Sequence, residues 1–124
     1  MLQDEFTVEK YKLLDQFFSI GSNANPAEIK VVEKRINAFV KEYRSDRQID
    51  DVLQLIRFIA LTRITNEFES YVKIVEPIVN RLYVQEEWDF YDLRILVFTQ
   101  GSSDSLEKSE FLLNKAINII RYRI

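Results

Sequence analysis

The chain has no histidine and no cysteine among its 124 residues. The absence of histidine excludes Ser-His-Asp triads and imidazole-ligated zinc, and the absence of cysteine excludes disulfides, thiolate metal sites and cysteine nucleophiles. An enzyme of this composition would have to work with carboxylates, lysine, tyrosine or a bound cofactor. We therefore expect a protein that is not an enzyme, with no catalytic residues, no metal site and no cofactor.

Glycine and proline are scarce, with two residues of each. Gly21 and Gly101 alone cannot form a glycine-rich phosphate-binding loop. Many short strands would need more turn-forming residues than the chain has, so the composition favours long helices. The hydrophobic fraction of 47% and the charged fraction of 30% are typical of a globular protein. The expected fold class is all-α.

Long apolar runs are missing as well. No run approaches the roughly 20 residues that a membrane-spanning helix needs, and the first residues, MLQDE, do not resemble a signal peptide. The net charge of −3 argues against a nucleic-acid-binding surface, because phosphate affinity depends on clustered lysine and arginine. These features and the absence of cysteine favour a cytoplasmic protein that does not contact a membrane.

Apolar residues recur at helical spacing in six segments. Asn25, Pro26 and Glu28 form the clearest start signal, with a cap, a proline at N1 and a glutamate at N3. Pro77 either kinks the fourth helix or delays its regular part to about Val75. The expected helices run from about Glu5 to Ile20, Pro26 to Tyr43, Ile49 to Ile64, Phe68 to Tyr83, over residues 86–98, and from a cap at Asp104 to Ile124.

Short joints between successive helices predict antiparallel hairpins. The hairpins would begin near positions 5, 48 and 86, a spacing of about forty residues that is typical of helical-repeat proteins. We therefore expect a single domain over residues 1–124, built as a TPR-like stack of helix hairpins. An ordinary globular helix bundle is the alternative.

The sixth helix has a second apolar side. Leu112, Ile119 and Tyr122 lie off its main apolar stripe, which holds Leu106, Leu113, Ala116, Ile117, Ile120 and Ile124. A helix with two apolar sides needs a partner on each of them. We predict that Leu112, Ile119 and Tyr122 pack either on a further helix or on a second subunit. The second alternative predicts a homodimer, which is the partner that we expect.

Acidic residues gather at Glu86, Glu87, Asp89 and Asp92. They could be metal ligands or a general acid–base pair, but three of them stand where a helix begins, and the helix dipole favours negative charge there. We favour the structural interpretation. A basic stripe on the second helix, formed by Lys30, Lys34, Lys41 and Arg44, is likewise interpreted as a solvated face because Glu33 and Glu42 interrupt it.

Helical spacing places Asp92 on the same side as Trp88, Tyr91 and Ile95, facing the core. Arg63 falls within the apolar stripe of the third helix, so it either reaches past the helix end or meets a buried carboxylate. We predict a buried Arg63–Asp92 ion pair. Arg57 and Arg94 are the alternative partners of Asp92.

The segment from Arg81 to Leu93, RLYVQEEWDFYDL, resembles part of the C-terminal regulatory region of Rgg/GadR/MutR-type bacterial transcriptional regulators. The shared features are a Leu-aromatic pair, then a tryptophan, and then a tyrosine followed by an acidic residue. Leu2–Phe6 is similar to the stretch that follows the DNA-binding domain of such regulators. The chain departs from the family at Asp92, where Glu is more usual, and at Val97-Phe98, where a small residue and Asn are common.

The resemblance implies a helical-repeat domain that dimerises and binds a short signalling peptide. DNA contact would need a helix-turn-helix module, which this chain lacks, and we expect a fragment or a truncated relative of the family. The rival interpretation is an oligomerisation scaffold without a small ligand. The expected peptide groove is apolar with side-chain donors, and its candidate residues are Arg57, Phe58, Leu61, Arg94 and Val97.

Overall fold

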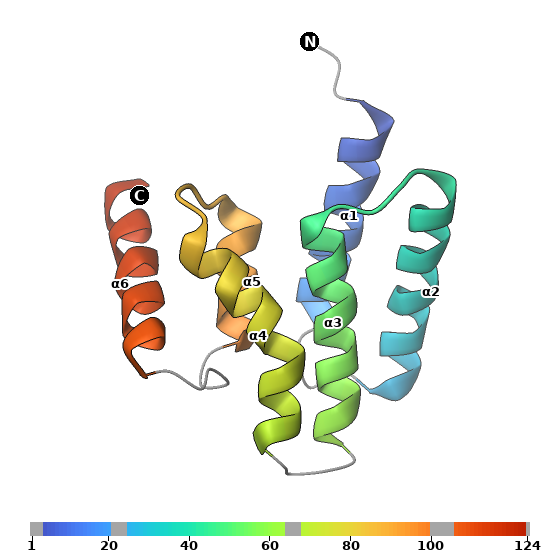
Figure 1. Cartoon of the computed structure of the whole chain (residues 1–124). Coiled ribbons are helices and arrows are strands. Elements are labelled where there is room, and N and C mark those ends of the chain that lie inside the picture. The colour runs from blue at the N-terminus through green and yellow to red at the C-terminus, as the bar shows by residue number, and fades with distance from the viewer. Residues whose placement is uncertain (1–3, 21–24, 64–67, 100–105, 124) are drawn as a thin grey trace. The chain divides into compact units, whose positions relative to one another are not determined.

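The computed structural model describes residues 4–20, 25–63, 68–99 and 106–123. All regular secondary structure in these ranges is helical, without strands, which confirms the all-α class with six helices. The helices are α1 (Glu5–Ile20), α2 (Pro26–Glu42), α3 (Arg47–Thr62), α4 (Phe68–Val84), α5 (Phe90–Thr99) and α6 (Leu106–Arg123) (Figure 1). The expected positions Gly21, Gly101 and Asp104 lie outside the described residues.

The chain divides into two compact units, Met1–Ile64 and Thr65–Ile124. The position of one unit relative to the other is not determined. In the first unit α1, α2 and α3 all contact one another, and in the second unit α4 contacts both α5 and α6. TPR-like stacking of hairpins along the whole chain stays a prediction, because it would require contacts from one unit to the other.

The first unit buries one apolar face of each of its three helices. The start of α2 has the expected capping box, in which Asn25 accepts from the Glu28 amide at 2.9 Å and the Glu28 side chain reaches back to the cap. Apolar residues then follow at helical spacing and meet in the core. The fully buried ones are Leu14, Phe17, Ile36, Ile49, Val52 and Leu55.

The helix α4 runs without a break through Pro77. Pro77 has no amide hydrogen and cannot donate to the carbonyl one turn earlier, yet the flanking Val75, Ile78 and Val79 are buried. The apolar packing of this face outweighs the lost hydrogen bond. A start of the regular helix near Val75 is therefore wrong, since α4 begins at Phe68.

Crossing a lipid bilayer needs a helix that is both long and apolar, and none within the described ranges meets both conditions.

An ion pair joins α1 to the start of α3. Lys10 Nζ lies 2.6 Å from Asp46 Oδ2, and the two side chains are only 11% and 22% exposed. The other oxygen of Asp46 caps α3 by accepting from the Ile49 amide at 3.0 Å. Burial alone would raise the pKa of Asp46, but the hydrogen bonds from Lys10 and Ile49 outweigh it and hold that pKa below the ordinary 3.8.

Two substitutions of Asp46 separate the ion pair from the cap. Asp46→Asn removes the charge opposite Lys10 but keeps a capping oxygen, because Asn and Asp are equivalent caps, whereas Asp46→Ala removes both. We expect D46N to lower the free energy of unfolding by about 1–2 kcal/mol and D46A by about 1 kcal/mol more. Urea titrations followed by far-UV circular dichroism measure both values. Glu9→Gln, in the exposed Lys12–Glu9 pair, is the control and should lower the free energy of unfolding by about 0.5 kcal/mol or less.

The contribution of Asp46 also depends on pH. Because its pKa is lowered in the folded state, the stabilisation is fully present above the ordinary 3.8 and is lost as the pH falls through the folded-state pKa. The stability difference between wild type and D46N should therefore stay constant near neutral pH and shrink in acid. A difference that does not change down to acidic pH would contradict this assignment.

Candidate functional site

The acidic segment before α5 caps that helix. Asp89 Oδ1 accepts from the Asp92 amide at 2.9 Å, and Asp92 Oδ2 accepts from the Asp89 amide at 3.1 Å. This reciprocal pattern is a capping box with aspartate at both positions. No group of three or more acidic side chains in the described part of the chain could hold a metal ion. The interpretation as a helix start holds for Asp89, which caps α5, whereas Glu86 and Glu87 lie before the cap in the α4–α5 connection.

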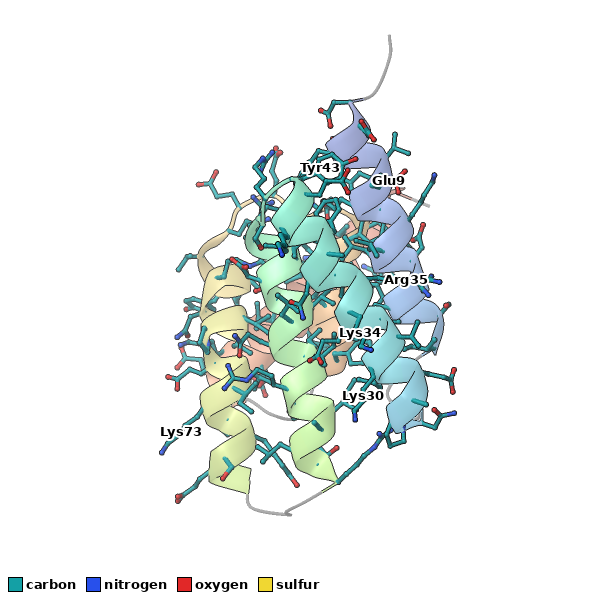
Figure 2. The ribbon with its side chains drawn as sticks, turned by 90° about the vertical axis from the view of Figure 1, so that its right-hand side faces the viewer. Glu9, Lys30, Lys34, Arg35, Tyr43 and Lys73 are labelled. Carbon is teal, nitrogen blue, oxygen red and sulfur yellow. The ribbon has the colours of Figure 1, made fainter. Side chains whose placement is uncertain are left out.

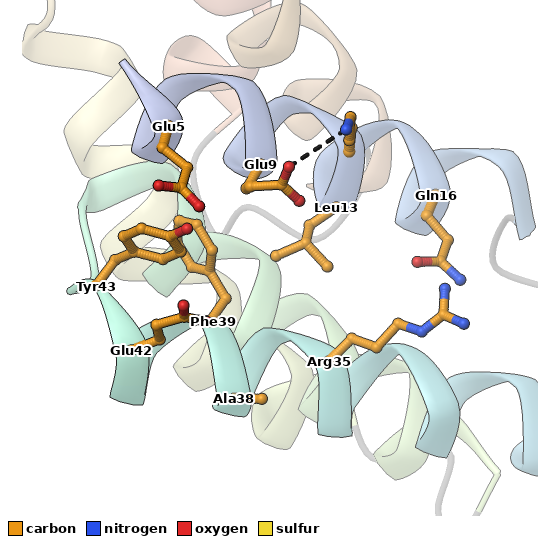
Figure 3. A pocket seen from close by; sticks show the side chains of 10 residues that line it. Glu5, Glu9, Leu13, Gln16, Arg35, Ala38, Phe39, Glu42 and Tyr43 are labelled. Atoms are coloured by element: carbon orange, nitrogen blue, oxygen red, sulfur yellow. Dashed lines mark hydrogen bonds and ion pairs between the residues drawn. The ribbon is translucent and has the colours of Figure 1, made fainter.

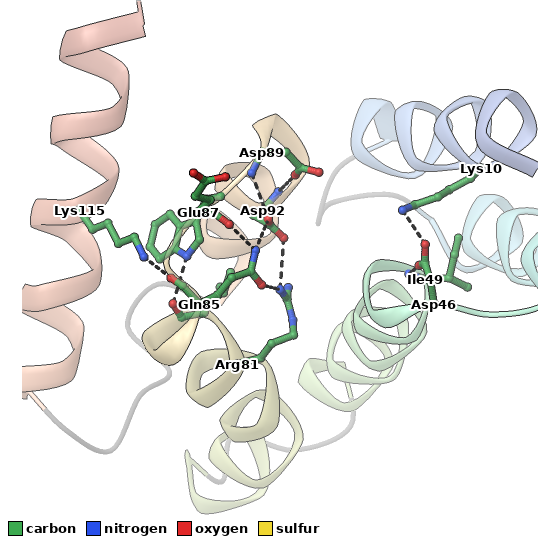
Figure 4. Close-up of polar contacts among 11 residues, drawn as sticks. Lys10, Asp46, Ile49, Arg81, Gln85, Glu87, Asp89, Asp92 and Lys115 are labelled. Atoms are coloured by element: carbon green, nitrogen blue, oxygen red, sulfur yellow. Dashed lines mark hydrogen bonds and ion pairs between the residues drawn. The ribbon is translucent and has the colours of Figure 1, made fainter. Parts of the chain in front are cut away.

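The Asp92 carboxylate also ties α5 to the end of α4, as Figure 4 shows. Arg81 Nη1 lies 3.3 Å from Asp92 Oδ1, and Gln85 Nε2 donates to Asp92 Oδ2 at 3.0 Å. Arg81 donates in turn to Gln85 Oε1 at 2.6 Å. The Asp92 side chain is fully buried, so these donors replace the water that a carboxylate would otherwise bind.

The expected burial of Asp92 against an arginine is confirmed, but the arginine that the structure places there is Arg81. Arg81 was not among the candidates, because its contact depends on a loop that folds back over the end of α4, and helical spacing cannot show a loop's path. Arg57 and Arg63 belong to the first unit, and Arg63 is exposed at the C-terminal end of α3. Arg94 lies over the Phe90 ring at 5.2 Å. Pairing of Asp92 with Arg63 stays a prediction.

Trp88 precedes α5 and does not belong to it, so the expectation that it shares a helical face with Tyr91 and Ile95 is wrong. The helix begins only after the Asp89 cap. Trp88 is 2% exposed and its indole N–H donates to the Leu82 carbonyl at 3.1 Å. Ile95 is fully buried, as expected, and Tyr91 is half-buried.

Lys115 brings α6 to this same connection. Its ammonium group lies 4.6 Å from the centre of the Trp88 ring and donates a hydrogen bond to the Gln85 carbonyl. A cation at the C-terminal end of α4 is favourable because the helix dipole is negative there. The α4–α5 connection therefore holds both α5 and α6 through a few polar contacts.

A groove of about 360 Å³ lies between α5 and α6. Its walls are apolar except for Asp89 and Arg94. Three of its side chains are strongly exposed, with exposed fractions of 62% for Phe90, 71% for Val97 and 47% for Ile120. The full lining is Trp88, Asp89, Phe90, Leu93, Arg94, Val97, Ile119 and Ile120.

Two of the five predicted ligand-binding residues, Arg94 and Val97, line this groove. The other three lie on α3 in the first unit, where Arg57 is exposed and Phe58 and Leu61 are half-buried. Whether the five face one another is not determined, because they belong to different units. The sequence did not single out two groove residues, Phe90 and Leu93. Both follow the Asp89 cap, so predicting which way they face would have required knowing the residue at which α5 begins.

The main apolar stripe of α6 is only partly buried, because its Ala116 lies in the core while its Leu113 and Ile117 are exposed. Leu112 was expected at an interface, but it is 2% exposed and packs in the core with Ala116, so that assignment is wrong. Ile119 lines the groove, and the Tyr122 side chain lies outside the described residues. The exposed side of α6 instead carries Leu113, Ile117 and Ile120. Both sides are equally apolar, so spacing alone could not decide which faces the core.

A second, larger pocket of about 500 Å³ lies between α1 and α2 in the first unit (Figure 3). Two of its acidic groups, Glu5 and Glu9, interact with neighbours within the pocket. Hydrogen bonding to Glu5 raises the pKa of Tyr43 to about 12, with burial and nearby carboxylates adding to the effect. Glu9 pairs with Lys12 at 3.2 Å. No sequence motif marked this pocket.

The basic residues of α2 form an exposed face. Lys30, Lys34 and Lys41 are exposed, with Lys30 and Lys34 labelled in Figure 2. Arg44 departs from the stripe because its guanidinium lies 3.9 Å from the centre of the Phe6 ring. This arrangement favours the solvated-face interpretation over a phosphate-binding surface.

Removing the Asp92 side chain should destabilise the second unit strongly. Asp92→Ala leaves the partly buried Arg81 guanidinium without its counter-charge and removes half of the capping box, so we expect a loss of about 3 kcal/mol or more. Asp92→Asn keeps an acceptor for the Asp89 amide and should lower the free energy of unfolding by less than Asp92→Ala does. Glu86→Ala changes an exposed acidic residue nearby and is the control. Urea unfolding monitored by Trp88 fluorescence reports on this unit, and D92A as stable as E86A would show that the network contributes little.

Comparisons of the chain with protein-family models, with curated proteins and with solved structures found no match in any of the three.

Proposed function

We propose that the chain works by binding another polypeptide through the second unit, with the α5–α6 groove as the central contact. The observation that carries this proposal is the groove itself, whose exposed rim is formed by Phe90, Val97 and Ile120. Apolar grooves that accept an amphipathic helix or an extended segment are a common mode of peptide recognition. The partner is a second subunit or a short apolar peptide.

The distribution of exposed apolar side chains supports a role for the second unit in particular. Among the described residues, Val31 is the one large apolar side chain of the first unit that is exposed. The second unit exposes eight, and an accumulation of this kind marks an interaction surface. They are Tyr83, Val84, Phe90, Val97, Phe111, Leu113, Ile117 and Ile120.

The resemblance to Rgg-type regulators supports the same proposal from another direction. In that family a helical domain dimerises and reads a peptide signal, and Arg94 and Val97 were expected at the peptide site. In this proposal the chain is a regulatory interaction domain, and any contact with DNA is made by another module. Binding by an apolar groove requires neither catalysis nor a cofactor.

Occupancy of the groove can be read directly, because Trp88 is the one tryptophan of the chain and lines the groove. The dye 1-anilinonaphthalene-8-sulfonate should bind there and accept energy from Trp88. Val97→Asp places a charge on the apolar wall. It should raise the dissociation constant of the dye, measured by this energy transfer, about tenfold, in line with a hot-spot contact. Val31→Asp alters an equally aliphatic exposed side chain in the first unit and should leave the transfer unchanged.

Peptides then test the function itself. Amphipathic helical peptides and extended apolar peptides should raise the thermal unfolding midpoint of the wild type, since a ligand that binds the folded state stabilises it. V97D should lose this stabilisation, and V31D should keep it. Equal stabilisation of V97D and wild type by a bound peptide would place the binding surface elsewhere.

A further inference from the structure

The exposed side of α6 continues the groove. Ile120 lines the groove, and Ile117 and Leu113 follow it along the same side of the helix with exposed fractions of 44% and 45%. A neighbouring side of α6, roughly 90° away around the helix axis, is buried through Leu112 and Ala116, and α6 contacts α4 of its own unit. The helix lies at the edge of the second unit (Figure 1), and the exposed fractions of these three side chains show that this outer side is partly open to solvent.

The spacing of this outer side is that of a coiled-coil seam. Leu113, Ile117 and Ile120 are separated by four and then three residues, which places them at d, a and d positions of a heptad. Glu110 occupies the preceding a position. Glu107, Asn114 and Arg121 then occupy the e positions, and all three are exposed.

The charges on the seam distinguish between the two possible directions of a partner helix. In a parallel pair of identical helices, a positions face each other, so Glu110 would meet Glu110 of the partner subunit and the two would repel. In an antiparallel pair, a positions face d positions, so Glu110 meets the partner's Ile120 and its carboxylate can turn to solvent. The parallel arrangement also brings no opposite charges together at the flanking positions.

An antiparallel pair places e positions beside e positions. Around a two-fold axis near Asn114, Glu107 lies beside the partner's Arg121, and Arg121 lies beside the partner's Glu107. The same axis sets Leu113 against Ile117 of the partner subunit. One helix therefore carries complementary apolar and charged residues for a second copy of itself, which is the requirement for a two-fold symmetric interface.

We infer that the chain forms a homodimer through an antiparallel pairing of α6 with α6 of a second copy, with two Glu107–Arg121 ion pairs flanking the Leu113–Ile117 contacts. This inference rests on the proposed function, because it names the polypeptide that the second unit binds. The seam of one helix is short, about 27 Å for 18 residues. The exposed groove residues Phe90 and Val97 beside Ile120 extend the contact area on each copy.

Sedimentation equilibrium from about 1 µM to about 500 µM tests the inference with the whole chain, a range that covers moderate affinities. The wild type should change from monomer to dimer over this range. Ile117→Asp places a charge at the centre of the seam and should raise the dimer dissociation constant about 30-fold or more. Val31→Asp is the matched control, exposed to a similar fraction, and should dimerise like the wild type. A wild type that stays monomeric, or an I117D variant that dimerises like V31D, would overturn the inference.

Charge exchange tests the direction of the helices. Glu107→Arg and Arg121→Glu should each weaken self-association about tenfold, because both ion pairs become repulsive. An equimolar mixture of E107R and R121E should recover dimers, since each mixed pair contains two attractive contacts, and the double variant E107R/R121E should also recover them. Without recovery in the mixture, the antiparallel register is wrong.

These outcomes are distinguishable from failure of the proposed function. If the protein is monomeric at all concentrations but peptides still stabilise it through Val97, the groove binds another polypeptide and the self-pairing of α6 is refuted. If I117D abolishes dimerisation but V97D binds dye and peptides like the wild type, dimerisation is established and the groove does not bind peptides.

Discussion

The buried carboxylate of Asp92 is the constraint on which the second unit depends. A carboxylate that is fully removed from water must find donors, because an unpaired buried charge is very unfavourable. Asp92 finds them in Arg81 and Gln85 at the end of α4 and in the Asp89 amide at the start of α5. These three donors come from one short stretch of chain, so satisfying them fixes where α4 ends, how the loop returns and where α5 begins.

The position of the groove follows from the same network. Once the α4–α5 connection is held, the Leu82 carbonyl receives the Trp88 indole and the Gln85 carbonyl receives Lys115 of α6. Both acceptors belong to the C-terminal end of α4, whose last carbonyls have no partner within the helix. The hydrogen bond from the Trp88 indole to the C-terminal end of α4 therefore positions Trp88 at the groove. The contact of Lys115 with the same end of α4 positions α6 beside α5. Polar contacts set the positions, and the apolar side chains fill the space between them.

Local features of the fold were predictable because their causes lie within a few residues. The Asn25–Glu28 capping box, which depends on two side chains three residues apart, was predicted, whereas α5 was expected to begin near residue 86 and begins after the equally spaced Asp89–Asp92 box. The groove and the Arg81–Asp92 pair depend on the path of a loop, which no spacing rule describes. The prediction that Ile117, and not Leu112, faces the core was wrong for a different reason. Both sides are apolar, so only the partners that surround the helix could decide it.

The exposed apolar side of α6 supports the proposal that the second unit binds another polypeptide. The core could have been completed by α6 with a polar outer face, as in an ordinary amphipathic helix, because Leu112 and Ala116 already face inward. Leu113, Ile117 and Ile120 are each nearly half exposed, and exposing this apolar surface to water is unfavourable for a separate subunit. The first unit, by contrast, exposes a single large apolar side chain, Val31, among its described residues. In the dimer that we propose, the second copy covers this apolar outer side, and the charges at Glu107 and Arg121 are complementary to those of the same helix in that copy.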